Sequence, residues 1–199
     1  MIISPSMAHP LPDWDLLYQQ GGLPQPISVG EVDRFRYYTG AAPGQVALDI
    51  GTGLGSFACR MAKIGLHVTG YDSSPTAIER ARHFHTGHAN ERFETHNFDV
   101  GAAPPHLVPG SVDFVVCRHV LPFLDATRLI TDIRRWLRRD NGVLHVTTSV
   151  SEKRPNGSKV HALSEAAVKE LARGWASSRR YDLDPAGAVT AVVLRGPYG

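Results

Sequence analysis

The sequence predicts an α/β protein: a three-layer sandwich in which helices cover both faces of a seven-stranded, mostly parallel sheet. Three observations support this prediction. Apolar strand runs alternate with helical patterns along most of the chain, which is typical of parallel strands joined by crossover helices. The first strand runs directly into a glycine-rich turn and a helix. The last two strand runs follow one another with a short loop between them, which predicts a closing antiparallel hairpin.

The first strand is an apolar run over residues 46–49 that ends in Asp49, and the helix after it begins at Ser56. Glycine lacks Cβ and tolerates positive φ, so the intervening turn lets the backbone approach a ligand closely. A dinucleotide fingerprint places its third glycine three residues after the second. Here glycines stand at alternate positions, and a carboxylate precedes them that would repel a pyrophosphate. We therefore expect a cofactor with a cationic amine, bound by Asp49 and by the turn residues Gly51, Thr52, Gly53 and Gly55.

Acidic residues also follow the next two predicted strands. The run 66–71 leads into Asp72 and Ser73, about twenty residues beyond the glycine turn, where a ribose-binding acid is expected. The run 93–98 leads into Asp99 and Val100. Any one of these aspartates alone could instead cap a helix or form a turn. Three acids after three successive strands favour a shared binding site.

The remaining elements follow the same alternation of periods. Helices are expected over residues 75–83 and 124–137 and from about Ser164, and strands over 112–117, 143–150, 178–183 and 188–194. Asp140-Asn141-Gly142 is expected to end the long helix. The last two strands form the predicted hairpin, which would place an antiparallel edge strand beside the parallel ones.

The composition of the chain limits the classes of partner and compartment that are expected. The chain has 199 residues, 42% hydrophobic and 20% charged, and its net charge of +2 gives no field that would favour nucleic acid or membrane partners. Cys59 and Cys117 form no disulfide framework, and the first residues lack a charged, then apolar, leader pattern. We expect a soluble cytoplasmic protein, a monomer or homodimer, without a metal. Three close histidines, His83, His85 and His88, have no Cys or Asp at ligand spacing and are interpreted as a solvated helix end.

The stretch D-I-G-T-G-L-G that begins at Asp49 resembles the first motif of class I S-adenosylmethionine-dependent methyltransferases. The strand order with its closing hairpin is similar to the Rossmann-like sheet of that class over nearly the whole chain. The resemblance implies S-adenosylmethionine as cofactor and S-adenosylhomocysteine as product. It implies that Asp49 lies at the methionine amine, Asp72 and Ser73 at the ribose, and Asp99 and Val100 at the adenine, with Cys117 and Tyr18 completing the cofactor site.

Three further segments give a narrower resemblance. The opening 14–24, the run 120–126 before the long helix, and Gly174-Trp175 resemble the tellurite-resistance and thiopurine-type small-molecule methyltransferases. This implies a helical lid over residues 1–40, a cofactor-binding core over 41–199, and a small-molecule acceptor. The aromatic residues concentrated before the core fit such a lid, and they fit equally a helix that covers an edge of the sheet; both accounts can hold together.

The chemistry of such a cofactor asks little of the protein. A sulfonium methyl is already electrophilic, so the enzyme must align a nucleophile and exclude water. Acceptors bind outside the carboxyl ends of the strands, so Arg118 and His119 should lie beside the methyl group. We predict His119 as general base for a hydroxyl or amine, His161 as a second candidate, and Arg118 as the residue that orients an anionic acceptor. A structural role for His119 stays open, and a thiolate, selenide or tellurium oxyanion would need no base.

The leading hypothesis is methyl transfer from S-adenosylmethionine to a small molecule: a secondary metabolite, an amine, a phenol or a chalcogen species. The alternative is a protein that binds S-adenosylmethionine without methyl transfer, as a cofactor-dependent pericyclic catalyst or a regulatory partner. It is motivated by the lack of a convincing acid/base pair around residues 117–119.

Overall fold

A computed structural model describes residues 12–22, 26–28, 30–87, 89–100, 102–155, 157–158 and 160–197. Its seven-stranded sheet has the order β3-β2-β1-β4-β5-β7-β6. The strands are β1 (Val46–Ile50), β2 (His67–Asp72), β3 (Glu91–Thr95), β4 (Phe114–Arg118), β5 (Val143–Ser149), β6 (Ser177–Asp182) and β7 (Val189–Arg195). Strands β1 to β5 pair in parallel, and β7 pairs antiparallel with both β5 and β6. The predicted sheet and hairpin are confirmed. One detail is corrected: β7, which runs against the other strands, lies inside the sheet, and β6 forms the edge.

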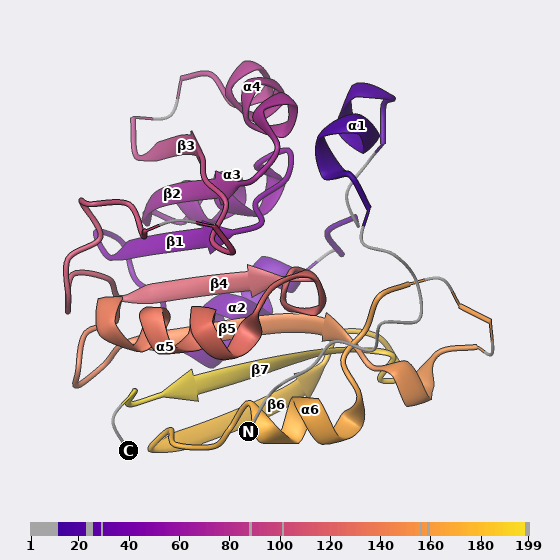
Figure 1. Cartoon of the computed structure of the whole chain (residues 1–199). Coiled ribbons are helices and arrows are strands. Elements are labelled where there is room, and N and C mark those ends of the chain that lie inside the picture. Colours follow the sequence, from indigo (N-terminus) through magenta and orange to yellow (C-terminus); the bar gives the residue numbers. More distant parts are fainter. Residues whose placement is uncertain are drawn as a thin grey trace.

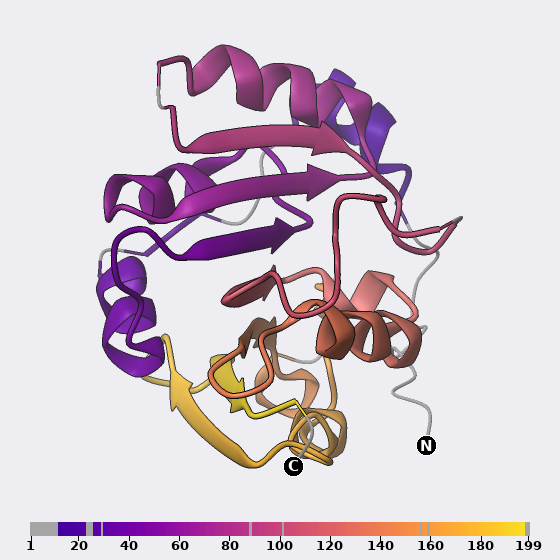
Figure 2. The same ribbon diagram turned by 90° about the vertical axis from the view of Figure 1, so that its left-hand side faces the viewer.

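Helices cover both faces of this sheet, as predicted (Figures 1 and 2). They are α1 (Trp14–Gln19), α2 (Glu31–Thr39), α3 (Ser56–Lys63), α4 (Pro75–Phe84), α5 (Ala126–Trp136) and α6 (Glu165–Glu170), with single 3-10 turns at Leu121–Phe123 and Ser151–Lys153. Helices α5 and α6 pack on one face of the sheet, whereas α2, α3 and α4 pack on the other. The three-layer sandwich is therefore confirmed.

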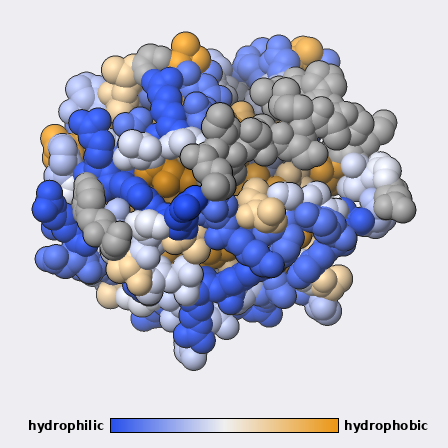
Figure 3. Space-filling model, turned by 60° about the horizontal axis from the view of Figure 1, so that its bottom comes forward, coloured by the Kyte–Doolittle hydropathy of each residue, from blue (hydrophilic) through white to orange (hydrophobic). Residues whose placement is uncertain are grey.

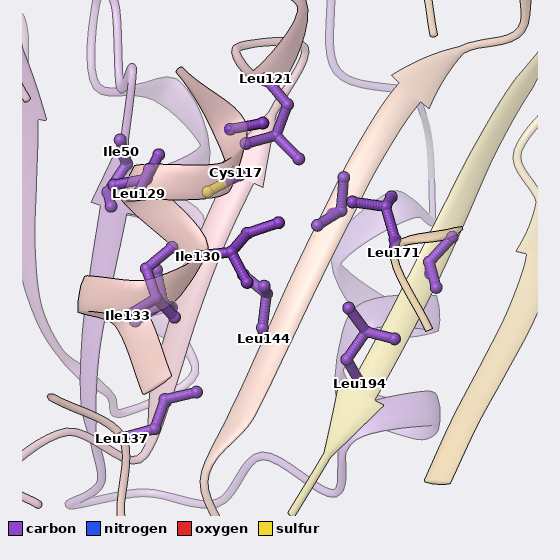
Figure 4. Packing of buried hydrophobic residues seen from close by; sticks show 14 of the residues in the cluster. Ile50, Cys117, Leu121, Leu129, Ile130, Ile133, Leu137, Leu144, Leu171 and Leu194 are labelled. Carbon is purple, nitrogen blue, oxygen red and sulfur yellow. The ribbon is translucent and has the colours of Figure 1, made fainter. Parts of the chain in front are cut away.

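The larger core lies between α5 and the strands. Leu129, Ile130 and Ile133 recur at helical spacing and face the sheet, so α5 buries a continuous apolar stripe. Figure 4 shows them beside Ile50 of β1 and Cys117 of β4, which belong to the same core on the sheet side. Burial of apolar side chains on both faces makes the sheet a rigid base for the loops at its carboxyl ends.

The third strand and the long helix differ from their predicted bounds. The third strand ends at Thr95, its last residue paired with β2, instead of continuing to residue 98, so Asp99 lies in a loop beyond the sheet. The long helix begins at Ala126, because the Asp125 side chain accepts the Arg128 N–H at 3.1 Å and caps it. It ends at Trp136, before the predicted stop at residues 140–142.

On the face shown in Figure 3, hydrophilic side chains predominate and the visible hydrophobic ones lie in small separate groups. None of the helices in the described residues is long and apolar enough to cross a membrane.

Candidate active site

A cavity of about 790 Å³ lies at the carboxyl ends of the strands. Residues that follow β1, β2, β3 and β4 form its wall together with α1, the segment 26–27 and the pair 160–161. Its volume falls within the range of roughly 300–1,000 Å³ that is typical of small-molecule sites. Strand β1 lies between β2 and β4, where the strand order reverses, and this is where open α/β sheets bind ligands.

Asp49 of β1 lines this cavity and is buried. Its Oδ2 accepts a hydrogen bond from the Thr52 hydroxyl at 2.7 Å, whereas Oδ1 has no hydrogen-bond partner among the described residues. Burial raises the pKa of the Asp49 carboxyl to about 7, against the opposing effects of the Thr52 hydrogen bond and the Arg118 charge. An ammonium group would supply the missing partner and favour the ionised form, so this site fits the methionine amine of S-adenosylmethionine.

The turn after β1 leaves no room for a side chain at Gly51 or Gly55. A Cβ on Gly51, where φ is 71°, would lie 2.5 Å from Val120 Cγ2, and a Cβ on Gly55, where φ is 75°, would lie 2.6 Å from Phe93 Cε1. Gly51 and Thr52 line the cavity. Gly53 and Gly55 lie outside its wall and act by shaping the turn.

Asp72 connects the end of β2 to the glycine turn. Its Oδ2 accepts the Gly53 N–H at 2.9 Å, and its Oδ1 accepts the Ser74 N–H at 3.0 Å. Burial raises the pKa of this carboxyl, and the backbone N–H groups of Ser74 and Gly53 oppose that shift. Each oxygen retains a lone pair, and both Asp72 and Ser73 line the cavity. A ribose with two adjacent hydroxyls fits these acceptors.

The structure separates the other predicted cofactor residues. Asp99 lines the cavity, and its Oδ1 accepts the Asp125 N–H at 2.9 Å, so it also fixes the start of α5. Val100 is 64% exposed and lies outside the cavity wall. Cys117 is fully buried in the core on the α5 side, because β4 alternates its side chains between two buried faces. The structure thus places Asp99 in the cavity wall and neither Val100 nor Cys117.

Helix α1 closes one side of the cavity and lies at the carboxyl ends of the strands, beside α4 (Figure 1). Asp15 Oδ1 accepts the Ser74 hydroxyl at 2.6 Å and the Thr76 N–H at 2.9 Å, so α1 is attached next to Asp72. Tyr18 is buried and lines the cavity, as does Trp14. Helix α2 instead inserts Phe35 into the core and covers the sheet.

Arg118 lines the cavity, but two of its nitrogens bond the N-terminal segment. Nε donates to Glu31 Oε1 at 2.7 Å, and Nη2 donates to the Pro26 carbonyl at 2.7 Å. The Glu31 and Arg118 side chains are only 3% and 11% exposed. The guanidinium charge is therefore balanced within the protein, and this arrangement does not support the expected role in orienting an anionic acceptor.

His119 lines the cavity directly after β4. Its φ of 54° is unusual for a residue with a side chain, and its N–H donates to the Thr147 carbonyl at 2.7 Å, which holds this strained backbone in place. Burial lowers the pKa of the imidazole to about 4, and the Arg118 charge acts in the same direction. His119 is therefore neutral near pH 7, and the lowered pKa makes it a weaker base than an exposed imidazole.

Several cavity residues could not be recognised from the sequence. Phe123 contacts Trp14 edge to face with ring centroids 4.8 Å apart, and it contacts His161 at 4.8 Å. Tyr71, His96, Phe98 and Arg60 also line the cavity. The one available signal is position, since each lies in or next to a segment that follows a strand.

Of the clustered histidines, His85 has a structural role, whereas His83 is exposed at the end of α4. His85 Nε2 lies 2.9 Å from the Leu54 carbonyl oxygen and so fixes the glycine turn, whereas His88 lies outside the described residues. Within the described ranges, no group of three or more His, Cys, Asp or Glu side chains could hold a metal ion.

Comparison with known proteins agrees with this geometry. Residues 48–146 match the model of a family described as a methyltransferase domain. This stretch begins in β1 and ends in β5, so it contains the glycine turn, Asp72, Asp99 and His119. No curated protein matches the sequence.

Solved structures share the fold at low identity. An S-adenosylmethionine-dependent methyltransferase from Aquifex aeolicus superposes with a TM-score of 0.66 and 18% identity, covering 81% of this chain and 87% of that one. Phosphoethanolamine N-methyltransferase 2 of Haemonchus contortus, solved with S-adenosylmethionine, gives a TM-score of 0.61 and 20% identity over 77% of this chain and 38% of its own. The [4+2]-cyclase SpnF gives a TM-score of 0.62 and 16% identity over 84% and 80%.

Proposed function

We propose that this protein, whose residues 48–146 match a methyltransferase domain and whose cofactor is S-adenosylmethionine, transfers the methyl group to a small-molecule acceptor. The observation that supports it best is Asp49, which lines the same cavity as Asp72 and His119 and whose buried Oδ1 has no hydrogen-bond partner among the described residues. A cofactor bound by Asp49 and Asp72 would lie in the same cavity as the His119 imidazole and the apolar rings of Trp14 and Phe123.

The cavity residues have different proposed roles. When bound, the cofactor supplies a methyl group activated by the sulfonium. Asp49 and Asp72 bind and orient it, and Asp99 stands at the adenine end of the same wall. His119, neutral near pH 7, accepts the proton of an acceptor hydroxyl or amine at one of its ring nitrogens. Trp14 and Phe123 exclude water from the acceptor.

The lid assignment is part of this proposal. Residues 1–40 are proposed to cover the site, and residues 41–199 to form the core. Support comes from α1, which forms one wall of the cavity and is attached through Asp15 to the residues that follow Asp72. Of the lid aromatics, Trp14 and Tyr18 line the cavity, whereas Phe35 belongs to the core.

Product analysis tests the proposal. The protein is incubated with isotopically labelled S-adenosylmethionine and a panel of phenols, amines and thiols, and methylated product and S-adenosylhomocysteine are quantified by mass spectrometry. Equal amounts of the two products are expected for at least one acceptor. An Asp72→Ala variant serves as the matched control and, with the cofactor well below its wild-type dissociation constant, should give about tenfold less of both products.

A second candidate is a protein that binds S-adenosylmethionine without transferring the methyl group, as a pericyclic catalyst or a regulatory partner. Two observations favour it: the [4+2]-cyclase among the structural neighbours, and the engagement of Arg118 by Glu31 beside His119. This candidate predicts tight cofactor binding with no S-adenosylhomocysteine formed from any acceptor.

A further inference from the structure

The cavity divides into two halves along the sheet. Asp49 lies in β1, Asp72 ends β2, and Asp99 lies in the loop after β3. These three strands occupy one side of the strand order, whereas β4 and β5 lie on the other. The second side, here called the acceptor half, consists of cavity-lining residues from the N-terminal segment and from the loops after β4 and β5: Trp14, Pro26, Ile27, His119, Phe123 and His161.

Rings and apolar side chains dominate this half. Trp14 meets Phe123 edge to face at 4.8 Å, and Phe123 meets His161 at 4.8 Å, so three elements far apart in the chain form one row of rings. Such a row favours a flat apolar group, because aromatic pairs gain from stacked and edge-to-face contacts beyond simple burial.

Glu31, which lies outside the cavity wall, balances the positive charge of Arg118, which lines it. Arg118 precedes His119 in the chain. Its guanidinium donates two hydrogen bonds to Glu31 of α2, from Nε to Oε1 at 2.7 Å and from Nη2 to Oε2 at 3.3 Å. The imidazole of His119 is neutral near pH 7. Arg154 also lowers the pKa of His119 through its charge, but it does not line the cavity. An anionic acceptor that enters the acceptor half would therefore lose its hydration without contacting an uncompensated cation, which is unfavourable.

We propose that the acceptor is an uncharged molecule that presents a planar aromatic group with a hydroxyl or amine, and that Glu31 determines this specificity by neutralising Arg118. The proposal rests on the proposed function, since it concerns the acceptor side of the same cavity. Glu31 acts through Arg118 and does not touch the acceptor.

A purely structural role for Glu31 would be to hold the start of α2. Its Oε2 accepts the Ser28 N–H at 3.1 Å, two residues before the Gly30 N-cap, and this contact fixes the chain that enters the helix. The 2.7 Å contact of Oε1 with Arg118, 87 positions away, is not part of that role. A purely structural role predicts that loss of the carboxylate lowers stability and leaves the charge preference of the cavity unchanged.

A matched pair of probes separates these roles. Dissociation constants of 2-naphthol and of 6-hydroxy-2-naphthoate are measured by fluorescence near neutral pH, with the protein saturated by S-adenosylhomocysteine. The wild type is expected to bind the neutral probe at least about tenfold more tightly. Glu31→Gln should reduce or reverse this ratio by about tenfold or more, because the guanidinium then attracts the carboxylate. Asp33→Asn, which removes an exposed carboxylate from the same turn of α2, should keep the wild-type ratio.

Three results would overturn the proposal: equal or tighter binding of the carboxylate by the wild type, binding of neither probe, or a Glu31→Gln ratio that stays with the Asp33→Asn control. If circular dichroism shows Glu31→Gln unfolded, Glu31→Asp, which keeps the charge but shortens its reach, should give an intermediate ratio, and an unchanged one counts against the proposal. Because these measurements need no methyl transfer, a wild type that prefers 2-naphthol yet methylates nothing would reject the proposed function alone.

Discussion

Replacing Asp49 with Asn tests how the protein recognises its cofactor. Asn keeps the size of the side chain, and its oxygen can still accept the Thr52 hydroxyl, but it cannot carry the charge that an ammonium group would meet at Oδ1. A hydrogen bond to a charged group contributes about 1.5–3 kcal/mol, which corresponds to a roughly 10- to 150-fold loss of affinity. Isothermal titration with S-adenosylhomocysteine near pH 8 measures this loss.

The raised pKa of Asp49 adds a pH dependence with a definite sign. In the ligand-free protein the carboxyl has a pKa of about 7, so below that pH it must lose a proton before it can bind a cation. Wild-type affinity should therefore fall about tenfold per pH unit below 7, and the Asn variant should show no such fall. 5′-Methylthioadenosine, which lacks the amino-acid portion, is the matched ligand and should bind both proteins alike at every pH.

Stability should move in the opposite direction. Because the folded-state pKa lies above the usual 3.8, the protonated carboxyl stabilises the fold below pH 4, and this contribution is lost as the pH rises through about 7. The difference amounts to at most about 4 kcal/mol. Ligand-free Asp49→Asn should thus melt above the wild type near pH 8. An unchanged affinity for S-adenosylhomocysteine, or an equal loss for 5′-methylthioadenosine, would refute the assignment of Asp49 to the amine.

Three other substitutions probe separate parts of the site. Asp72→Ala should weaken S-adenosylhomocysteine binding at least about tenfold by calorimetry, because it removes the ribose acceptors and two contacts to backbone N–H groups; unchanged affinity would exclude this role. His119→Gln should lower the rate of methyl transfer by about 10²-fold with cofactor affinity retained, and an unaffected rate would mean that no base is used. Gly51→Ala should lower the free energy of unfolding by about 1–3 kcal/mol in urea, since its Cβ would lie 2.5 Å from Val120 Cγ2; the double variant with Val120→Ala should recover part of this loss, and full stability of the single variant would contradict the close contact.

The cofactor-binding side of the cavity, which contains Asp49, Asp72 and Asp99, was easier to predict from the sequence than the acceptor half. Asp49, the alternate glycines and Asp72 lie within a short stretch of chain, so local spacing and strand endings were enough to bring them together in the prediction. Asp99 lines the cavity although β3 ends earlier than predicted, because the loop after Thr95 extends along the cavity wall. Val100, next to it, turns to solvent.

The acceptor half depends on contacts between distant segments, which no local pattern reveals. Glu31 meets Arg118 across 87 positions, and this pairing changes the expected role of the arginine. Cys117 could not be assigned to a face from alternation, since both faces of β4 are buried and apolar. The row formed by Trp14, Phe123 and His161 likewise joins three loops or helices that only the fold brings together.

A crystal structure of the protein with S-adenosylhomocysteine tests the central claim most directly, because it places each portion of the ligand against a named side chain. We expect the ligand amine within about 3 Å of Asp49 Oδ1 and the ribose hydroxyls at the same distance from Asp72. A ligand bound elsewhere, or bound in this cavity with its amine directed away from Asp49, would contradict it.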